Sequence, residues 1–357
     1  MTAPLVLGAG PAGCAAAIEL ARAGVEPTLI DRDAEVGDAL CGGFMSWRTA
    51  ETVRDLGVDL ADLGAHRVTE LALFAGARTA TAPLPSVGYG LSRYAFDTAL
   101  RKRAVEAGAH LEIDRARSIG PGLVGGEARA WHGDALFLAS GKHDVRGESR
   151  PRVSNDPALG LRIRLPAGEQ MRALVGERIE LHLFDGGYAG IVLQEDGSAN
   201  VCLAVRKSAL AGAGGNPRDL LDRLAGEHPH FGDRMAGAAS ELPIDTVGSV
   251  PYGYIARETQ PSLYRLGDQA AVIPSLAGEG MSIALASGIA AARAFRKGKS
   301  APDFQREFAA RATPPVQRAE RIWYLAENER VAPLALGLLG LVPRAADWAM
   351  RRTRIAA

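Results

Sequence analysis

The sequence has few cysteines and no metal-binding pattern, and these absences argue against several classes of site. Its three cysteines, Cys14, Cys41 and Cys202, lie far apart and form no CxxC pair. That spacing argues against a disulfide framework, a structural zinc site and a dithiol redox centre. The seven histidines show no metal-ligand spacing either. We therefore predict a protein without a metal site, in a reducing compartment.

An excess of one charge is also lacking, because 41 lysines and arginines balance 41 aspartates and glutamates. No dense basic stripe is present, so we expect no nucleic-acid partner. No apolar run reaches the roughly 18 residues that a membrane span requires. The first predicted strand begins close to Met1 and leaves no room for a signal peptide. The resulting expectation is a cytoplasmic location.

The C-terminal segment is the most apolar stretch of the chain. Residues 331–342 are rich in leucine, alanine and glycine, and four basic residues follow them closely: Arg344, Arg351, Arg352 and Arg354. We favour a C-terminal helix docked on the core. The alternative is a patch that dips into a membrane surface or lines the access route of an oily substrate. That alternative would make the protein membrane-associated at its periphery.

What the sequence does contain is a glycine turn between two predicted strands near its start. Residues 5–13 read Leu-Val-Leu-Gly-Ala-Gly-Pro-Ala-Gly, and Asp31 ends the next strand. Gly8 permits the tight turn, Gly10 lets the backbone approach a pyrophosphate, and Gly13 lets the helix pack closely on the strand. Asp31 is placed to accept hydrogen bonds from ribose hydroxyls. This pattern predicts an adenine-dinucleotide site that comprises Gly8, Gly10, Pro11, Ala12, Gly13, Asp31 and Arg32.

A second constellation spans residues 265–281 and is more specific. Asp268 ends a predicted buried strand, where its carboxylate can accept from a sugar-chain hydroxyl, and Gly278 and Gly280 open a helix. The positive end of that helix suits a ring that becomes anionic, as a reduced flavin does at N1 and O2. The sequence therefore predicts FAD, held here by Gly267, Asp268, Pro274, Gly278, Glu279, Gly280 and Met281.

No second glycine fingerprint is present for a nicotinamide nucleotide. We therefore expect NAD(P)H, if it is the reductant, to bind transiently without a Rossmann domain of its own. Delivery of electrons by a protein partner is the alternative. An NAD-dependent dehydrogenase is disfavoured, since the segment from Gly267 to Gly280 would then have no role.

The rest of the chain predicts a discontinuous nucleotide-binding domain with a sheet domain inserted in it. Helices are expected over 93–107, 217–227 and 281–295, and short strands over 160–165, 178–183, 189–193 and 200–205. The predicted nucleotide-binding domain comprises residues 1–68, 92–142 and 248–300. Residues 69–91 and 143–247 are predicted to form an antiparallel-sheet substrate domain. Residues 301–357 form a predicted C-terminal helical region.

Over about residues 3–300 the chain resembles the flavoprotein superfamily of geranylgeranyl reductases and para-hydroxybenzoate-hydroxylase-like monooxygenases. The two glycine motifs carry the resemblance, together with Cys41-Gly42-Gly43 and with Arg93 in the stretch 91–97. The resemblance implies a mixed α/β (α+β) fold: a glutathione-reductase-type, Rossmann-like FAD domain with an inserted antiparallel-sheet substrate domain and C-terminal helices. It also implies that Cys41 and Gly42 lie beside the isoalloxazine and that Arg93 reaches the pyrophosphate and ribityl region.

Departures from the superfamily's patterns bear on the reaction. Ala270-Ala271 and Glu279 resemble the reductase branch, as does Cys41-Gly42-Gly43, so we favour reduction of carbon–carbon double bonds in an isoprenoid- or polyketide-like substrate. Tyr188, however, is followed by Ala189 and Gly190 where reductases usually carry Tyr-x-Trp. The alternatives are a monooxygenase acting on an aromatic, quinone-like or polyketide substrate, and a non-catalytic or sensor flavoprotein.

Three side chains are candidates for catalysis. Cys41 could donate a proton near the flavin, although a small packing residue is an equal alternative. His143 beside Asp144 could act as an acid–base group, but such a residue is more often a solvated loop histidine. Tyr188 could line the substrate cavity with Tyr252 and Tyr254, and core aromatics in a sheet are the commoner explanation. The composition favours an apolar small-molecule substrate.

Overall fold

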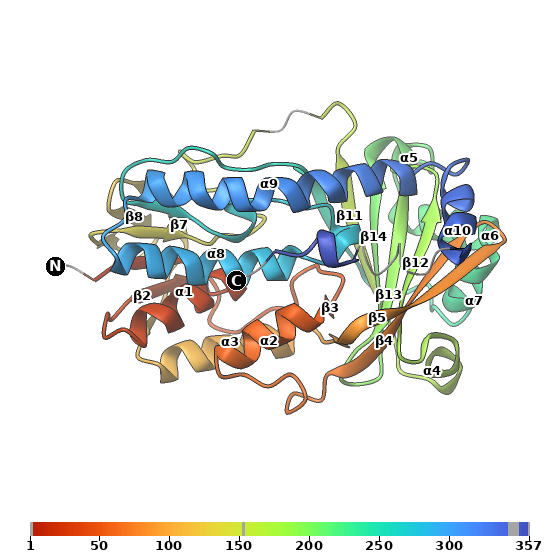
Figure 1. The fold of residues 1–357 in the computed structure, drawn as a ribbon, viewed down its shortest axis with the longest axis horizontal. Coiled ribbons are helices and arrows are strands. Elements are labelled where there is room, and N and C mark those ends of the chain that lie inside the picture. The colour runs from red at the N-terminus through yellow and green to blue at the C-terminus, as the bar shows by residue number, and fades with distance from the viewer. Residues whose placement is uncertain (1–2, 152–153, 342–349, 356–357) are drawn as a thin grey trace.

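The computed structural model describes residues 3–151, 154–341 and 350–355, and it shows two halves that are each built on a β-sheet (Figure 1). The first sheet has five strands in the order β16-β10-β1-β2-β6, all paired in parallel. These strands are β1 (Leu5–Leu7), β2 (Thr28–Asp31), β6 (His110–Ile113), β10 (Leu136–Leu138) and β16 (Leu263–Arg265). The sheet is the parallel core expected of a dinucleotide-binding domain.

Helices cover one face of the parallel sheet. They are α1 (Pro11–Ala21), α3 (Arg93–Glu106), α8 (Gly280–Arg296) and α9 (Ala301–Ala326). The largest apolar cluster of the protein joins α1, α8 and α9 to the sheet. The expected helices over 93–107 and 281–295 therefore agree with α3 and α8 to within one residue at each end.

A small antiparallel sheet covers the opposite face, and the sequence analysis did not anticipate it. Its strands are β7 (Ala116–Gly120), β8 (Leu123–Gly126) and β9 (Ala130–His132). Val124 is fully buried against Leu5 and Leu138 of the parallel sheet. These strands escaped detection because they are short and largely polar, so that their alternation of apolar and polar residues is weak.

An eight-stranded sheet forms the second half, in the order β15-β11-β14-β13-β12-β4-β5-β3. All neighbours are antiparallel except β12 and β4, which run parallel, so the expectation of a purely antiparallel sheet is wrong at that pair. A long excursion through the first half separates these two strands, and only such a crossover permits parallel pairing. The strands are β3 (Phe44–Met45), β4 (His66–Ala75), β5 (Arg78–Gly90), β11 (Ala158–Leu165), β12 (Arg178–Phe184), β13 (Gly187–Leu193), β14 (Ala199–Arg206) and β15 (Ile244–Val250).

This sheet extends past the boundaries expected from the sequence. Its strands include residues 44–45, 66–68 and 248–250, which lie within the predicted bounds of the nucleotide-binding domain. Phe44, for example, pairs with Gly90 across β3 and β5. Such pairings join residues far apart in the chain, so local sequence patterns do not reveal them.

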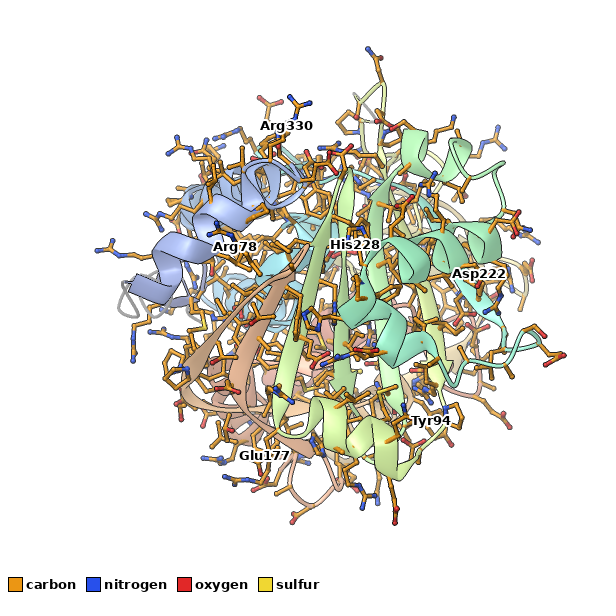
Figure 2. All side chains as sticks on the ribbon, turned by 90° about the vertical axis from the view of Figure 1, so that its right-hand side faces the viewer. Arg78, Tyr94, Glu177, Asp222, His228 and Arg330 are labelled. Atoms are coloured by element: carbon orange, nitrogen blue, oxygen red, sulfur yellow. The ribbon has the colours of Figure 1, made fainter. Side chains whose placement is uncertain are left out.

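Short helices cover the outer face of the eight-stranded sheet. Figure 2 shows α6 (Pro217–Glu227) and α7 (Pro229–Met235) in front of the strands, with Asp222 on α6 and His228 between the two helices. Beneath α7, the fully buried Glu180 carboxylate receives two hydrogen bonds from Arg234, at 2.9 and 2.8 Å. The remaining short helices are α2 (Trp47–Asp55), α4 (Glu169–Val175) and α5 (Lys207–Ala211).

The C-terminal segment begins as helix α10 (Ala332–Leu341), which lies at the edge of the eight-stranded sheet. Ala332 and Leu336 are buried there against Ala75 and Leu183, as expected of a docked helix. Leu334, in contrast, is 63% exposed. Val342 and Arg344 lie outside the described residues. Among the helices that the structure describes, none is long and apolar enough to cross a membrane.

Small residues let α1 and α8 touch. A Cβ at Gly288 of α8 would lie 2.2 Å from the carbonyl oxygen of Ala12 and 3.0 Å from the amide nitrogen of Ala16. Both atoms belong to the backbone of α1, so neither can rotate away. The two helices therefore approach more closely than any residue other than glycine would allow at this position.

We predict that Gly288→Ala destabilises the protein by about 1–3 kcal/mol, because the added methyl group forces α1 and α8 apart. Equilibrium unfolding in urea measures this change. Gly226→Ala in α6 is the matched control, since its Cβ would meet nothing within 4 Å. Helix propensity should make that control neutral or slightly stabilising. A Gly288→Ala protein as stable as the wild type would contradict the tight contact.

Candidate functional site

The first glycine turn joins β1 to α1 and has the geometry that a dinucleotide requires. Gly8 has φ +106°, and a Cβ there would lie 2.4 Å from the carbonyl oxygen of Ala139. A Cβ at Gly13 would lie 1.9 Å from the carbonyl oxygen of Gly8. At Gly10 a Cβ would meet only the guanidinium of Arg93, at 3.8 Å. The absence of a side chain at Gly8 and Gly13 thus allows the backbone of the turn to pack closely, and its absence at Gly10 leaves room for a ligand.

Asp31 ends β2, and its carboxylate holds this turn in place. Its Oδ2 accepts a hydrogen bond from the amide of Ala9 at 2.6 Å, and its Oδ1 accepts one from the amide of Asp33 at 3.0 Å. Arg101 lies 3.3 Å away. Each carboxylate oxygen has further lone pairs, so the predicted contact with a ribose remains compatible with these bonds. Arg32 is exposed and pairs with Asp33 at 2.8 Å, while Pro11 and Ala12 are buried at the start of α1.

Arg93 lies between the two glycine motifs. It follows the Ser92 N-cap of α3 and donates two hydrogen bonds to Asp97, at 2.7 and 2.5 Å. Burial disfavours its charge, but Asp97 outweighs burial and raises the pKa of Arg93 above its ordinary value. Cys41 and Asp268 also act electrostatically on Arg93. The structure therefore brings Gly10, Cys41 and Asp268 together around one fixed cation.

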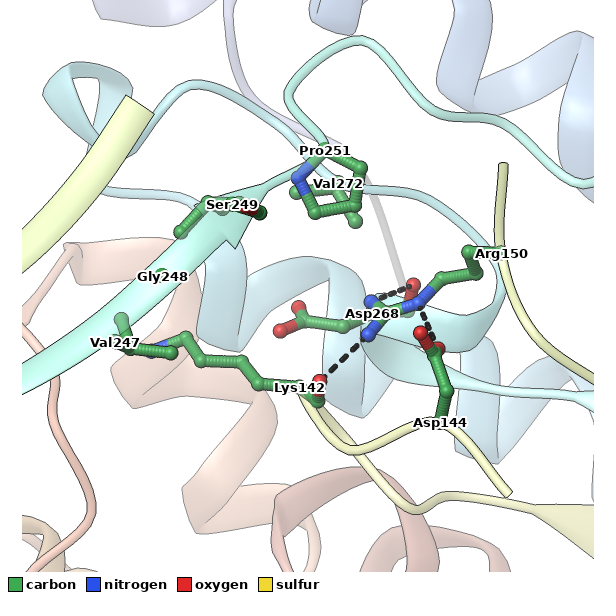
Figure 3. Close-up of a pocket in the computed structure, with 10 residues that line it drawn as sticks. Lys142, Asp144, Arg150, Val247, Gly248, Ser249, Pro251, Asp268 and Val272 are labelled. Atoms are coloured by element: carbon green, nitrogen blue, oxygen red, sulfur yellow. Dashed lines mark hydrogen bonds and ion pairs between the residues drawn. The ribbon is translucent and has the colours of Figure 1, made fainter. Parts of the chain in front are cut away.

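The second motif begins where β16 ends. Gly267 has φ +54°, and its amide donates to the hydroxyl of Ser287 on α8 at 2.8 Å. Asp268 follows in the short helix η1 (Gly267–Gln269), and its backbone carbonyl accepts from Arg150 at 3.1 Å. Figure 3 shows the Asp268 carboxylate pointing away from Arg150, into a pocket bounded by Lys142 and the end of β15. This orientation leaves the carboxylate available to a ligand hydroxyl.

The turn that opens α8 follows Pro274 and the short helix η2 (Ser275–Ala277). Gly278 has φ +66°, and a Cβ there would lie 3.1 Å from Cδ1 of Phe44, whereas a Cβ at Gly280 would meet nothing within 4 Å. The backbone at Gly280 and the buried Met281 start α8. Glu279 points the other way: its carboxylate is fully buried and pairs with Arg354. Only the backbone of Glu279 is placed to meet a cofactor.

Side chains cap most of the long helices, but not α1 or α8. Ser46, Ser92 and Ser300 accept hydrogen bonds from the first turns of α2, α3 and α9. In the described part of the chain, no side chain caps α1 or α8. The first amides of these two helices thus remain available, and they carry a partial positive charge. Both helices start at a glycine turn of the predicted cofactor site.

Cys41 and Gly42 lie in the loop before β3. The Cys41 carbonyl accepts from Asn200 at 2.9 Å, and a Cβ at Gly42 would meet nothing within 4 Å. Burial raises the pKa of Cys202 and of Tyr188, and the half-buried Cys41 thiol adds a smaller contribution to each. These contacts place the loop beside β14 and the buried Tyr188, and the expected position of Cys41 and Gly42 beside the isoalloxazine stays a prediction.

Tyr188 is buried on β13, and its hydroxyl donates to Ser275 at 2.8 Å. Tyr252 bonds the same serine hydroxyl at 2.5 Å, and Trp323 of α9 packs edge-on against Tyr188, with 5.6 Å between ring centroids. Burial raises the pKa of Tyr188 well above its usual value and that of Tyr252 to about 12. Both phenols therefore keep their protons at neutral pH. We call Tyr188, Tyr252, Ser275 and Trp323 the tyrosine cluster.

Trp323 was missed by the sequence analysis. The motif Tyr188-Ala189-Gly190 lacks the tryptophan expected two residues after the tyrosine, and the structure supplies one from α9 instead. No local pattern links these two positions, because they are far apart in the chain. The only signal in the sequence was a large aromatic residue on the apolar face of a long helix.

His143 lies in the exposed loop after β10. Its carbonyl accepts from Ser140 at 2.7 Å and from Gln269 at 3.1 Å. Partial burial, followed by the charges of Arg32, Lys142 and Arg150, lowers the pKa of its imidazole. These neighbours place His143 beside Arg32 rather than beside the tyrosine cluster. The position agrees with a loop histidine and gives no support to a catalytic role.

Comparisons with known proteins agree with this site. Residues 1–117 match the family described as "FAD binding domain". Digeranylgeranylglycerophospholipid reductase 2 of Methanopyrus kandleri is 28% identical over 80% of this chain and 74% of its own length. Menaquinone reductase of Mycobacterium tuberculosis is 26% identical over 81% of this chain and 75% of its own length. The flavin-dependent brominase Bmp2 shares the fold with a TM-score of 0.78, at 17% identity over 99% of this chain and 93% of its own.

The chain is an FAD-dependent oxidoreductase, and this makes it an enzyme rather than a non-catalytic flavoprotein. The resemblance to the flavoprotein superfamily of geranylgeranyl reductases and para-hydroxybenzoate-hydroxylase-like enzymes is confirmed. The residues present fit FAD, because a Cβ at Gly42 or Gly280 would meet nothing within 4 Å and one at Gly10 would meet only Arg93. A strip of open backbone thus runs past a fixed cation, as a dinucleotide with a pyrophosphate requires.

We predict that Arg93→Met weakens FAD binding roughly 10- to 100-fold, because a hydrogen bond from a charged donor to phosphate is lost. Titration of the apoprotein with FAD, followed by flavin fluorescence, measures the dissociation constant. Lys102→Met on the exposed side of α3 is the control and should bind FAD normally.

Arg93→Met also leaves the carboxylate of Asp97 without its partner, so a second variant is needed. In Arg93→Met/Asp97→Asn that buried charge is gone. We expect the double variant to bind FAD as weakly as Arg93→Met if the guanidinium contacts the cofactor directly. Full recovery of affinity would show that Arg93 serves only to neutralise Asp97.

Proposed function

We propose that this enzyme reduces carbon–carbon double bonds in an apolar, isoprenoid-like substrate, with NAD(P)H as a transiently bound electron donor. Both curated relatives described above are named as reductases, one for a geranylgeranyl lipid and the other for menaquinone. Because they align with about four-fifths of this chain, the similarity extends beyond the FAD-binding segment to the sheet half.

A pocket with aromatic walls is the observation that carries the proposal. It has a cavity volume of about 260 Å³, is partly open to solvent, and adjoins Pro274 at the start of the turn that leads into α8. Its aromatic side chains suit the apolar part of a substrate, and Arg206 and Glu320 also contribute one charge of each sign to the lining. Its walls include Tyr252, Tyr254, Trp323 and Tyr324.

Two residues of the tyrosine cluster can hold the proton that the reaction consumes. Reduction of a double bond adds a hydride to one carbon and a proton to the other. FAD, when bound, supplies hydride-transfer chemistry. Tyr188 and Tyr252 carry protons on Oη at neutral pH, and both contact Ser275 close to the α8 turn. We assign proton donation to this cluster, with Cys41 as the adjacent thiol.

The α8 turn has an electrostatic role in this proposal. Its first amides are uncapped and carry partial positive charge, which favours negative charge at the part of the cofactor that lies against it. Arg93 would neutralise the pyrophosphate, and Asp268 would accept a hydrogen bond from the sugar chain. The enzyme would thus hold the cofactor through backbone amides at the starts of α1 and α8, through one cation and through one carboxylate.

Contact with a membrane surface would give the enzyme access to such a substrate. Leu334 of α10 is 63% exposed, and Ala332 and Leu336 dock the helix on the sheet half. This arrangement leaves part of the helix facing outward, and we propose it as a peripheral contact with lipid.

Product analysis tests the reaction. We expect the purified yellow protein to lose its absorbance near ~450 nm when NADPH is added without oxygen. Menaquinone or a geranylgeranyl lipid should then restore the absorbance and gain two hydrogen atoms, which fragmentation in the mass spectrometer should locate in the isoprenoid chain rather than in the quinone ring. A product that gains an oxygen atom, formed only in air, would show a monooxygenase and overturn the proposal.

Tyr188→Phe separates proton donation from packing. It keeps the ring against Trp323 and removes only the hydroxyl, so we expect kcat to fall about 100-fold with KM little changed. Tyr252→Phe is the matched variant at the second phenol. Single-turnover reoxidation of the reduced flavin by substrate measures the step. An unchanged rate in both variants would assign the cluster to packing alone.

A further inference from the structure

The last described residues return to the second glycine motif. Arg354 is buried, and it donates a hydrogen bond to the carbonyl oxygen of Ala277 at 3.0 Å and another to the carboxylate of Glu279. Its guanidinium also lies over the ring of Trp47, 4.7 Å from the centroid. A residue far from the motif in sequence therefore contacts it at two positions.

The two contacts of Arg354 lie on either side of Gly278. On one side of the turn, the ring of Phe44 lies so close that a Cβ at Gly278 would be 3.1 Å from it. At Gly280, in contrast, a Cβ would meet nothing within 4 Å. Phe44 and Arg354 thus contact residues 277–279 of the turn, whereas the space beside Gly280, the first residue of α8, is unfilled. The open position is where the cofactor site requires backbone amides.

A buried glutamate without a positively charged partner would destabilise the folded protein at this position. The carboxylate of Glu279 is fully buried, and burial raises its pKa. The positive charge of Arg354 opposes this rise because it stabilises the ionised carboxylate. Hydrogen bonding from the hydroxyls of Ser282 and Ser46 opposes the rise in the pKa of Glu279 as well, after the charge of Arg354. Its Oε2 has no hydrogen-bond partner among the described residues. The pairing with Arg354 is therefore the main compensation for a buried carboxylate.

We propose that Arg354 is a positioning residue for FAD, which acts through Glu279 and the Ala277 carbonyl to fix the backbone of residues 277–280. The C-terminal residues 350–355 are then part of the cofactor site, although they need not touch the cofactor. The inference depends on FAD as the cofactor and is independent of the substrate and of the reaction proposed above.

FAD binding by variants of the full-length protein tests the inference. We expect Arg354→Met to weaken FAD binding at pH ~8 by at least about tenfold, because Glu279 is left buried and charged. Lowering the pH to about 5.5 should restore much of the affinity in this variant, since the carboxylate then takes up a proton. The affinity of the wild type should change less over the same range. A purely structural role for Arg354 would not produce this difference in pH dependence.

Two further variants make the test decisive. Arg354→Met/Glu279→Gln removes both charges and should recover most of the affinity at pH ~8. Arg318→Met is the matched control: Arg318 donates to the carbonyl of Arg352 at 2.8 Å at the surface, so its loss loosens the same segment without touching the pair. It should bind FAD as the wild type does.

Two results would overturn the inference. The first is an FAD affinity in Arg354→Met equal to that of the wild type at every pH. The second is an equal loss in Arg318→Met, which would assign the effect to docking of the segment rather than to the ion pair. If Arg354→Met does not fold, Arg354→Lys replaces it. The retained charge should preserve the wild-type pH dependence and most of the affinity, and a tenfold loss of affinity that is the same at pH ~8 and ~5.5 would count against the ion pair.

Discussion

The close contact between α1 and α8 is the constraint on which the cofactor site depends. The carbonyl oxygen of Ala12 lies 2.2 Å from the position of a Cβ at Gly288, and the Cβ of Ala12 lies 3.2 Å from the position of one at Gly267. Each helix begins at one of the two glycine turns, so their contact sets the distance between the turns. An extended ligand that binds both turns needs that distance to be constant, and the small residues at the contact provide it.

Features that depend on a short stretch of backbone could be predicted from the sequence. Gly8 and Gly13 belong to one turn, in which Gly8 has φ +106° and a Cβ at Gly13 would lie 1.9 Å from the carbonyl oxygen of Gly8. These two requirements for glycine are local, whereas the close approach of Ala139 to Gly8 is not. The start of α3 at Arg93 follows from its Ser92 cap. For the same reason, the sequence indicated correctly that Asp31 ends a strand. The expectation that Asp268 also ends a strand is wrong, because β16 ends at Arg265 and Asp268 lies in η1.

Features that join distant segments could not be predicted in this way. Trp323 reaches Tyr188 only because α9 crosses from one half of the molecule to the other, as Figure 1 shows. Arg354 meets Glu279 only because the chain returns to the α8 turn after α10. Contacts between residues so far apart in the chain cannot be inferred from local patterns in a single sequence. Glu279 itself was expected to face the cofactor, and the buried partner that turns its side chain away could not be foreseen.

The tyrosine cluster and the Arg354 pair illustrate why the fold alone does not determine the reaction. The brominase with a TM-score of 0.78 shares nearly the whole architecture, so the sheets and helices are compatible with more than one use of a reduced flavin. The tyrosine cluster is therefore the feature that bears on the proposed reaction, whereas the Arg354 pair bears on cofactor binding. A buried ion pair is often no more stabilising than an apolar pair of the same size. Its presence beside the cofactor turn is better explained by the need for one fixed backbone geometry there than by any contribution to folding.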